Sequence, residues 1–500
     1  MTASKFLFRA AGFRAAPRLA CMALSLVLGA CAVGPDYQRP QVAVGDDYKE
    51  VEGWTMARPA DAALRSDWWT VYGDATLERL MDGLMVSNQN IAQVEAQYRQ
   101  AQALLESARS GLFPVLGANA SGTRSGSGAD NDGGTGSGQG IGNPSNQYRL
   151  SGTVSWEPDL WGKIRRSVEA SRAGLAASAA DIAVTRLSMQ STLAQTYFRL
   201  RAADAQKRLL QQTVDAYERS LRTTRNRYEA GVAAQADVAV SRTQLENTRV
   251  QLQALDWQRA QYEHALAVLV GKAPSQFGLD PVPEVGGVPD IPVGLPSQLL
   301  ERRPDVAAAE RRMAQANARI GQAEAAWFPD LTLSAQAGFA SGRWAQWLTA
   351  PASFWSLGPA LALTIFDGGA RRAQVDEARA AYDAQVAAYR LSVLTALREV
   401  EDYLVQLHVL GQQQQTQAIA LESARESLTL TRNQYEAGLI DYLSVVQVEA
   451  TALSTERSAL TLRADRLVTS VQLIAALGGG WYTPEAAPPA AAGTVPGSRQ

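Results

Sequence analysis

The stretch Arg225–Gly231, with the sequence RNRYEAG, decides the fold because it recurs as Arg432–Gly438, RNQYEAG. Each copy ends a long run that is rich in alanine and free of proline, and each is followed by a second such run. A glycine just after the last turn of a helix is a C-cap, where the absent Cβ lets the chain reverse. The sequence therefore predicts two copies of a long helical hairpin in one chain.

The composition indicates a folded chain without obvious metal or thiol chemistry. The chain has 500 residues, two histidines, two cysteines and a formal net charge of −2, which argues against nucleic-acid binding. Cys21 and Cys31 both lie near the N-terminus, so the body of the chain has no disulfide framework. His264 and His408 lie in different copies on helical patterns, and no catalytic or phosphate-binding motif appears. We therefore predict neither an enzyme nor a bound cofactor.

The N-terminal segment has the layout of a secretory signal. Basic residues precede the apolar stretch 22–28, which is too short to span a membrane as a stable helix. The sequence LGAC at Leu28–Cys31 resembles a bacterial lipoprotein box, in which cleavage leaves Cys31 as the lipidated N-terminus. The alternative is an ordinary cleavage site with an incidental cysteine. We expect a signal peptide over 1–30 and an extended tether over 31–60.

Between the helical runs, the hydrophobic period changes from helical to two. Apolar residues alternate with small or polar ones over about 113–122 and 147–157 in the first copy, and over about 329–340 and 354–366 in the second. Segments of about ten residues with one apolar face are typical of transmembrane β-strands. A half-buried strand of a soluble sheet has the same alternation. The loop inside the first pair is rich in Gly and Ser, which predicts a surface loop.

Each copy is thus predicted to contain a helix, two strands, a long helix, a turn and a shorter return helix. The first repeat, 61–296, should hold a helix at about 77–110, a long helix at 161–230, a return helix at 235–270 and a linker at 272–296. The second repeat, 297–480, should hold helices at 304–326, 370–437 and 441–477, followed by a tail at 481–500. The long helices would extend about 100 Å, so they must project from a membrane core of about 30 Å. If the strands lie in a membrane, four of them cannot close a barrel there, so several chains must each contribute four.

Several motifs occur together along almost the whole chain: the lipoprotein box, VGPDY at 33–37, DWW at 67–69, LERRPDV at 300–306, FDGG at 366–369, the two YEAG turns and ALGGGW at 476–481. In these motifs the chain resembles the outer-membrane factor (TolC-like) family, and more specifically the lipoprotein branch of RND efflux outer-membrane channels. The resemblance implies an α+β membrane protein: a homotrimer with a twelve-stranded outer-membrane β-barrel, continued by a long periplasmic α-helical barrel. An equatorial domain would include the linker and the tail.

The resemblance also implies a function and partners. The chain would be a passive duct in the outer membrane, expelling drugs and other small toxic solutes as part of a tripartite efflux system. Its partners would be a periplasmic adaptor, an inner-membrane RND pump and outer-membrane lipid. Two alternatives stay open: a duct for type I protein secretion or an ABC-driven exporter, and a lipid-anchored periplasmic coiled-coil scaffold without a pore.

In this family the helix turns form the periplasmic tips, which an apolar ring and nearby carboxylates close at rest. Leu443 matches the apolar gate position, and its alternative role is ordinary helix packing. Gln447 stands where relatives place a carboxylate, so Asp441 or Asp237 would have to supply an acidic ring. The gate would then belong mainly to the second tip. The turn residues are expected to stabilise the tips and contact the adaptor, or simply to cap the helices: Gly231, Gly438, Tyr228, Tyr435, Arg225 and Arg432.

Overall fold

The structure is a computed structural model, and it describes residues 33–40, 48–49, 67–126, 144–282, 286–289, 291 and 303–479. The expected signal peptide, Cys31, most of the tether, the Gly/Ser-rich loop from 127 to 143 and the tail after 480 lie outside the described residues. The described chain consists of long α-helices and one four-stranded antiparallel sheet, which confirms the predicted α+β class. Among the helices that the structure describes, none is both long and apolar enough to cross a membrane.

The order of the elements repeats along the chain. The α-helices are α2 (Ala75–Ser87), α3 (Gln89–Ser110), α4 (Lys163–Glu229), α5 (Gln235–Leu269), α7 (Pro304–Ala325), α8 (Ala370–Glu436) and α9 (Tyr442–Ala476). The strands are β1 (Val115–Ser125), β2 (Ser145–Trp156), β3 (Asp330–Ser341) and β4 (Ser353–Ala362). The long helices α4 and α8 each contain 67 residues, and the return helices α5 and α9 each contain 35. The equal lengths show the tandem repeat in the structure itself.

The first helix of the first repeat differs from the expectation. Where the sequence predicts one helix over about 77–110, the structure has α2 and α3, separated by Asn88 in an extended conformation. The Asn88 side chain accepts hydrogen bonds from the amides of Asn90 and Ile91, at 3.0 and 3.1 Å, and so caps α3. Its amide group also donates to the carbonyl oxygen of Leu269 at 2.8 Å. A contact with the end of α5 thus holds the break, and helical periodicity does not reveal such a contact.

Strand β4 ends at Ala362, before the expected end at 366. Ala362 pairs with Asp330, the first residue of β3, so β4 has no partner further along. The chain then turns into α8, where the Asp367 carboxylate accepts hydrogen bonds from the amides of Gly369 and Arg371, at 3.0 and 3.2 Å. The strand therefore stops where its neighbour starts, whatever the alternation of its own residues.

The chain divides into two compact units, and each of them draws on both repeats. We call Met1–Pro40, Arg99–Ala176 and Arg311–Ala387 the sheet unit, and Gln41–Tyr98, Ala177–Glu310 and Ala388–Gln500 the hairpin unit. The repeats meet because β2 of the first pairs with β3 of the second. The compact units therefore differ from the division near residue 296 that the repeat suggests.

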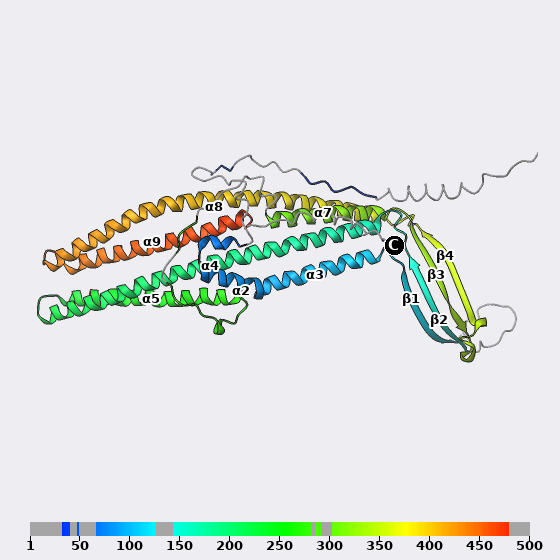
Figure 1. The fold of residues 1–500 in the computed structure, drawn as a ribbon, viewed down its shortest axis with the longest axis horizontal. Helices are drawn as coiled ribbons and strands as arrows, with labels where there is room; N and C mark the ends of the chain where they lie inside the picture. The colour runs from blue at the N-terminus through cyan, green and yellow to red at the C-terminus, as the bar shows by residue number, and fades with distance from the viewer. Residues whose placement is uncertain are drawn as a thin grey trace, which may run out of the picture. The chain divides into compact units, whose positions relative to one another are not determined.

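In the sheet unit, the four strands lie in the order β1-β2-β3-β4 (Figure 1). Their register aligns the apolar positions, since Ala335 faces Val154 on one side and Leu357 on the other. Val154 in turn faces Leu116 on β1. Residues directly opposite one another in an antiparallel pair lie on the same face. The apolar residues of all four strands therefore form one continuous face.

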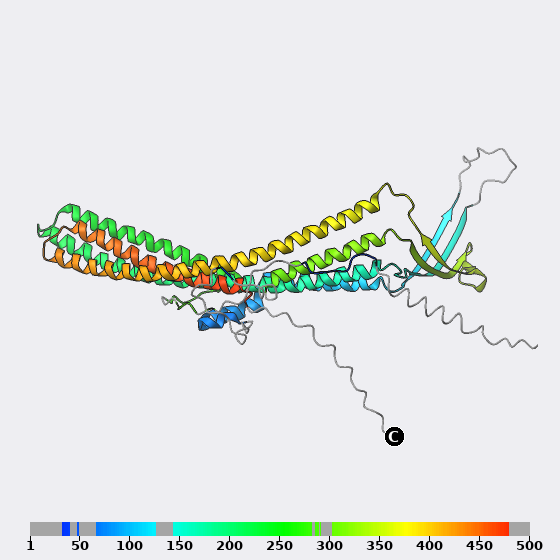
Figure 2. The same cartoon turned by 90° about the horizontal axis from the view of Figure 1, so that it is seen from above.

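In the hairpin unit, α5 runs beside the second half of α4, and α9 runs beside the second half of α8 (Figures 1 and 2). The core of this unit forms where the short 3-10 helix η2 (Trp68–Tyr72) and α2 pack on α4, α5, α8 and α9. The side chain of Trp68 is buried, and its Nε1 donates to Oε1 of Gln190 at 3.2 Å. The aromatic cluster after Asp67 thus anchors the first helices.

Candidate functional site

The apolar face of the sheet is exposed to its surroundings. On β4, Trp355 and Leu357 are 80% and 76% exposed, and Leu116 on β1 is 78% exposed. The opposite face carries Thr, Ser and Gln, for example Ser334 and Gln336 on β3. In a soluble sheet such an apolar face would pack on a core, and this one does not within the described chain. A continuous exposed apolar surface is characteristic of a protein or membrane interaction site.

The sheet also has two open edges. In the part of the chain that the structure describes, β1 pairs only with β2, and β4 pairs only with β3. Unpaired backbone groups of an edge strand invite further pairing, and they are not tolerated in lipid. The single chain is therefore incomplete as a membrane structure.

Aromatic side chains gather at both ends of the sheet. At one end, the ring of Tyr148 lies 5.3 Å from that of Trp344 and 6.1 Å from that of Trp347. At the other end, Trp161 stacks on Phe328 with the ring centroids 4.8 Å apart. Aromatic belts on both sides of an apolar band are typical of membrane–water interfaces. The sheet thus has the surface pattern of a membrane-embedded structure.

Both repeated turns have the helix-capping geometry that the sequence predicts. Gly231 and Gly438 each have φ of 75°, in the left-handed region that favours glycine. In each turn, the amide after the glycine donates to the carbonyl five residues earlier, at 2.8 Å in the first copy and 2.9 Å in the second. This is the hydrogen bond of a Schellman motif. A Cβ at either glycine would meet open space, so the positive φ itself requires glycine.

Of the residues expected at the gate, Leu443 and Gln447 lie one turn apart on an exposed face of α9. Asp441 precedes them as the N-cap of the helix, and its Oδ1 accepts from the amide and the hydroxyl of Ser444 at 3.0 and 2.5 Å. The hydroxyl and amide hydrogen bonds hold the pKa of Asp441 below its ordinary value. The carboxylate is therefore charged and already serves as a helix cap.

The other candidate carboxylate, Asp237, has the same kind of role in the first copy. Its Oδ2 accepts from the amide of Ala234 at 3.1 Å, at the start of α5. Arg225 and Tyr228 are exposed near the end of α4. The first tip thus presents polar groups and a cap but no counterpart of Leu443, since Ala236 stands at the matching place.

A group of side chains that we call the tip cluster, Ser220, Arg227, Tyr435 and Tyr442, joins the two copies. The Tyr442 hydroxyl and the Ser220 hydroxyl lie 2.9 Å apart and share a hydrogen bond. Tyr442 packs on Tyr435 with the ring centroids 5.5 Å apart, and the Arg227 guanidinium lies 4.9 Å from the centre of the Tyr435 ring. Burial raises the pKa of the Tyr435 hydroxyl. The cluster ties α4 of the first repeat to α8 and α9 of the second.

Arg432, expected as a tip residue, binds a buried carboxylate that sequence reasoning missed. Its Nη2 and Nε donate to Oε1 of Glu449 at 2.8 and 3.1 Å. The Glu449 side chain is only 8% exposed, and its Oε2 has no hydrogen-bond partner within the described chain. A signal was available, because Glu449 lies on the same face of α9 as the buried Tyr442 and Val445. A charge at such a seam position predicts a buried partner.

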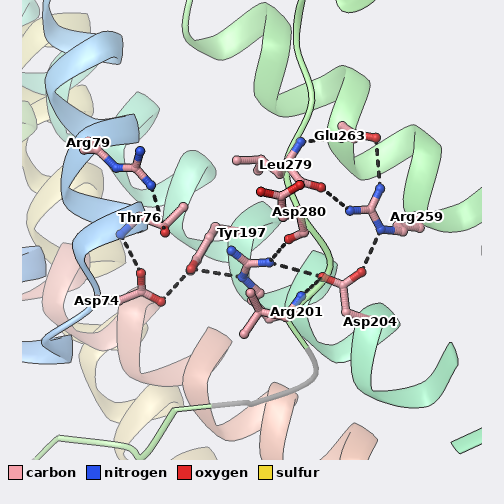
Figure 3. A network of polar contacts seen from close by, with 11 residues as sticks. Asp74, Thr76, Arg79, Tyr197, Arg201, Asp204, Arg259, Glu263, Leu279 and Asp280 are labelled. Carbon is pink, nitrogen blue, oxygen red and sulfur yellow. Dashed lines mark hydrogen bonds and ion pairs between the residues drawn. The ribbon is translucent and has the colours of Figure 1, made fainter. Parts of the chain in front are cut away.

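A second polar arrangement fixes the start of the linker between the repeats (Figure 3). Asp204 on α4 lies at its centre with no exposed side-chain surface, and it accepts from Arg201 at 3.2 Å and from Arg259 at 2.7 Å. Its Oδ2 also accepts from the amide of Val282 at 3.2 Å. Arg201 donates in addition to the carbonyl oxygen of Asp280 at 2.9 Å. The linker is thus bound through its backbone.

The two ends of this arrangement lie on different helices. On α5, Arg259 donates to the carbonyl oxygen of Leu279 at 2.6 Å, and Glu263 accepts from the amide of the same residue at 2.6 Å. On α4, the Tyr197 hydroxyl donates to the α2 cap residue Asp74 at 2.5 Å. Burial, followed by the hydrogen bond to Asp74, raises the pKa of Tyr197 to about 12, so the hydroxyl stays a neutral donor. Sequence reasoning identified none of these residues, although Arg201 and Asp204 interrupt an apolar run.

In the described chain, no group of three or more His, Cys, Asp or Glu side chains is placed so that it could hold a metal ion. Its distinctive features are instead structural: an exposed apolar sheet with open edges, long helical hairpins and polar contacts that join the hairpins at their tips. These features are suited to a structural protein or to a channel rather than to a ligand-binding site.

Comparison with known proteins identifies the family of this chain. The family model described as outer membrane efflux protein matches residues 80–272 and 295–479. The chain is 30% identical over 461 residues to the probable efflux pump outer membrane protein TtgC of Pseudomonas putida, covering 92% of this chain and 94% of the relative. It is 30% identical over 472 residues to the outer membrane protein OprJ of Pseudomonas aeruginosa, covering 93% and 96%.

Solved structures agree with these relatives. The structure of the outer-membrane channel OprN superposes with a TM-score of 0.82 at 29% sequence identity, covering 90% of this chain and all of that one. TtgC is thus named as an efflux pump outer membrane protein, and OprN as an outer-membrane channel. Together with the repeated hairpins and the exposed sheet, the match shows that this chain belongs to the outer membrane efflux protein family.

Proposed function

We propose that this chain is one subunit of a homotrimeric duct, which passively conducts small toxic solutes out of the cell. The observation that carries the proposal is the four-stranded sheet with an exposed apolar face and two open edges. Open edges and exposed backbone are excluded from lipid, so such a sheet must be completed by further strands. Three copies would supply twelve strands, above the roughly eight that the smallest membrane barrels need.

The polarity of the sheet supports a conduit. The face with Leu116, Val154 and Leu357 would meet lipid, and the face with Ser334 and Gln336 would line a water-filled interior. The 67-residue helices are about 100 Å long, more than three times the thickness of a membrane core. They would continue the conduit into the periplasm. A scaffold without a pore would have no need for such a sheet.

The family supports the assignment of partners and cargo. Relatives in Pseudomonas putida are named as outer membrane proteins of a toluene efflux pump and of an antibiotic efflux pump. We propose that this chain likewise receives drugs or solvents from an inner-membrane RND pump through a periplasmic adaptor. The duct would perform no reaction of its own. A lipid on Cys31 would anchor it in the outer membrane.

The exposed residues of the second tip support a gate. Leu443 lies on the first turn of α9, next to the buried Tyr442, and Gln447 follows it on the same face. In a trimer, three copies of Leu443 would form an apolar ring that resists wetting. Asp441 and Asp237 would add negative charge nearby while capping their helices. The exposed turn residues Arg225, Tyr228 and Gly231 would face the adaptor, together with Arg432, Gly438 and the half-buried Tyr435 of the second copy.

Single-channel recording of the purified protein in a planar lipid bilayer tests both parts of the proposal. The wild type should run as a heat-modifiable trimer and show small, rare conductance steps, and Leu443→Ser should raise the conductance. Leu439→Ser is the matched control, because Leu439 is an exposed leucine of the same turn. Equal conductance in the two variants would remove Leu443 from the gate, and a monomer without conductance would refute the duct itself.

A further inference from the structure

The segment Val33–Asp36 is bound by side chains of the sheet unit. All three nitrogens of Arg166 are engaged: Nε donates to the carbonyl oxygen of Val33 at 3.1 Å, Nη2 donates to that of Gly34 at 3.1 Å, and Nη1 donates to Glu169 at 2.7 Å. The Arg166 side chain is only 6% exposed. An arginine this deeply buried is positioned by the groups that it binds rather than by solvent.

Other groups complete the site around the same short segment. The Asn317 amide on α7 donates to the carbonyl oxygen of Pro35 at 2.9 Å, and the amide of Val33 donates to the carbonyl oxygen of Trp161 at 3.1 Å. Three successive carbonyls and one amide are therefore all bound by the body of the protein. Arg166 also pairs with Asp36 at 3.0 Å, but that carboxylate is largely exposed and contributes less.

At this site the backbones of Gly34 and Gly321 pack against each other so closely that there is no room for a Cβ at Gly34. A Cβ on Gly34 would lie 2.4 Å from the Cα of Gly321 on α7, and Gly34 has φ of 101°, where an L side chain is strained. A Cβ on Gly321 would lie 2.9 Å from the carbonyl oxygen of Val33. Glycine inside a helix such as α7 weakens that helix. The contact with the N-terminal segment explains why a glycine occupies this position.

The site lies at an end of the sheet. Trp161, which binds the Val33 amide, belongs to the aromatic pair with Phe328 between the strands and their helices. Only Ala32 lies between Cys31 and Val33 in the sequence, and an extended chain covers at most about 3.6 Å per residue. The bound residue Val33 is therefore only two positions along the chain from the expected lipidation site.

We propose that Val33–Asp36 is an intramolecular ligand for the site built by Arg166, Asn317 and Gly321, and that this docking holds the N-terminal anchor at the rim of the membrane sheet. Residues 33–36, which lie within the expected extended tether, are bound to the body of the protein. The docking rests on the observed contacts, and the role of the acyl chain rests on the lipidation of Cys31 proposed above. The sheet and its anchor would thus insert as one body.

Hydrogen exchange of the purified mature protein, read at the Val33 amide, tests the docking. Gly34→Ala and Gly321→Ala should each speed exchange by at least about tenfold, since either methyl group blocks this close packing and the first also strains the backbone. Gly321→Ala should strengthen α7 itself, so lost protection cannot come from a weaker helix. Gly358→Ala is the control, because a Cβ on Gly358 of β4 meets open space.

Two further measurements separate docking from anchoring. Intact mass of the mature N-terminus reports the acyl chains on Cys31, and the heat-modifiable fraction in the outer membrane reports insertion. Acylated glycine variants with less inserted protein than wild type and Gly358→Ala support the proposal. Unchanged Val33 exchange in both glycine variants overturns the docking, and unchanged insertion overturns its role in anchoring. An N-terminus without acyl chains overturns the proposed lipid anchor and leaves the exchange result standing.

Discussion

Replacing Asp204 with Asn should release the linker between the two repeats. The fully buried Asp204 carboxylate accepts from two arginines and from the amide of Val282. A carboxamide of the same shape has only one acceptor oxygen, and its NH2 group would face an arginine or an amide that can only donate. At least one charge-assisted hydrogen bond must therefore be lost, and the NH2 group of the asparagine would face another donor.

The size of the effect follows from these contacts. A hydrogen bond to a charged group contributes about 1.5–3 kcal/mol, and burying an unmatched donor adds to the loss. Arg259 and Arg201 keep partners in Glu263 and in the carbonyl oxygen of Asp280, which limits the damage. We expect the free energy of local opening at 277–282 to fall by about 2–3 kcal/mol. Since 1.4 kcal/mol is a factor of ten, exchange of the Val282 amide should quicken about 30- to 150-fold.

Hydrogen exchange with mass spectrometry on the full-length protein measures this directly. Asp215→Asn is the control, because Asp215 is an exposed aspartate on the same helix. The effect should be centred on 277–282 and should extend to the end of α5, through Arg259. If exchange at Val282 in Asp204→Asn stays within about threefold of the control, then the carboxylate does not hold the linker and the reasoning fails.

Two other outcomes follow from the tip and from α9. Arg432→Gln should speed amide exchange over 430–449 by about tenfold or more, because it leaves the buried Glu449 carboxylate without its cation. The control is Arg425→Gln, at the more exposed pair with Glu456, and it should change exchange little. Equal effects of the two substitutions would contradict the argument. Burial raises the pKa of Asp465. The protonated side chain therefore stabilises the folded state at pH values below the ordinary pKa of 3.8, and this stabilisation is lost as the pH rises through the folded pKa. Asp465→Asn should therefore raise the melting temperature at neutral pH but not at pH values below 3.8. Asp441→Asn should instead lower the melting temperature at neutral pH, because the pKa of Asp441 is lowered in the folded state. Parallel pH profiles of the two variants would refute this assignment.

Much of the helical framework could be predicted because it depends on near neighbours in the chain. The glycine turns at Gly231 and Gly438 need only a positive φ, and a Cβ there meets nothing else. The period of apolar residues within one strand is likewise local. Predicted bounds of the long helices therefore lie within a few residues of α4 and α8.

The contacts that fix the candidate sites could not be predicted in the same way. The break at Asn88 depends on Leu269, and the tip cluster joins Ser220 to Tyr442. The linker is held by Asp204 and Arg259 through backbone groups that have no sequence pattern of their own. Such pairs are far apart in the chain, so neither periodicity nor capping signals can match them.

By itself, the sequence determined that two long hairpins and four amphipathic strands occur in tandem, because these follow from local period and from glycine and proline positions. Only the tertiary structure decided that β2 and β3 join the repeats in one sheet, and that Val33–Asp36 is docked beside it. Strand pairing and docking are settled by which distant groups satisfy one another's hydrogen bonds and fill one another's space. A strand's own alternation is the same whichever neighbour it has.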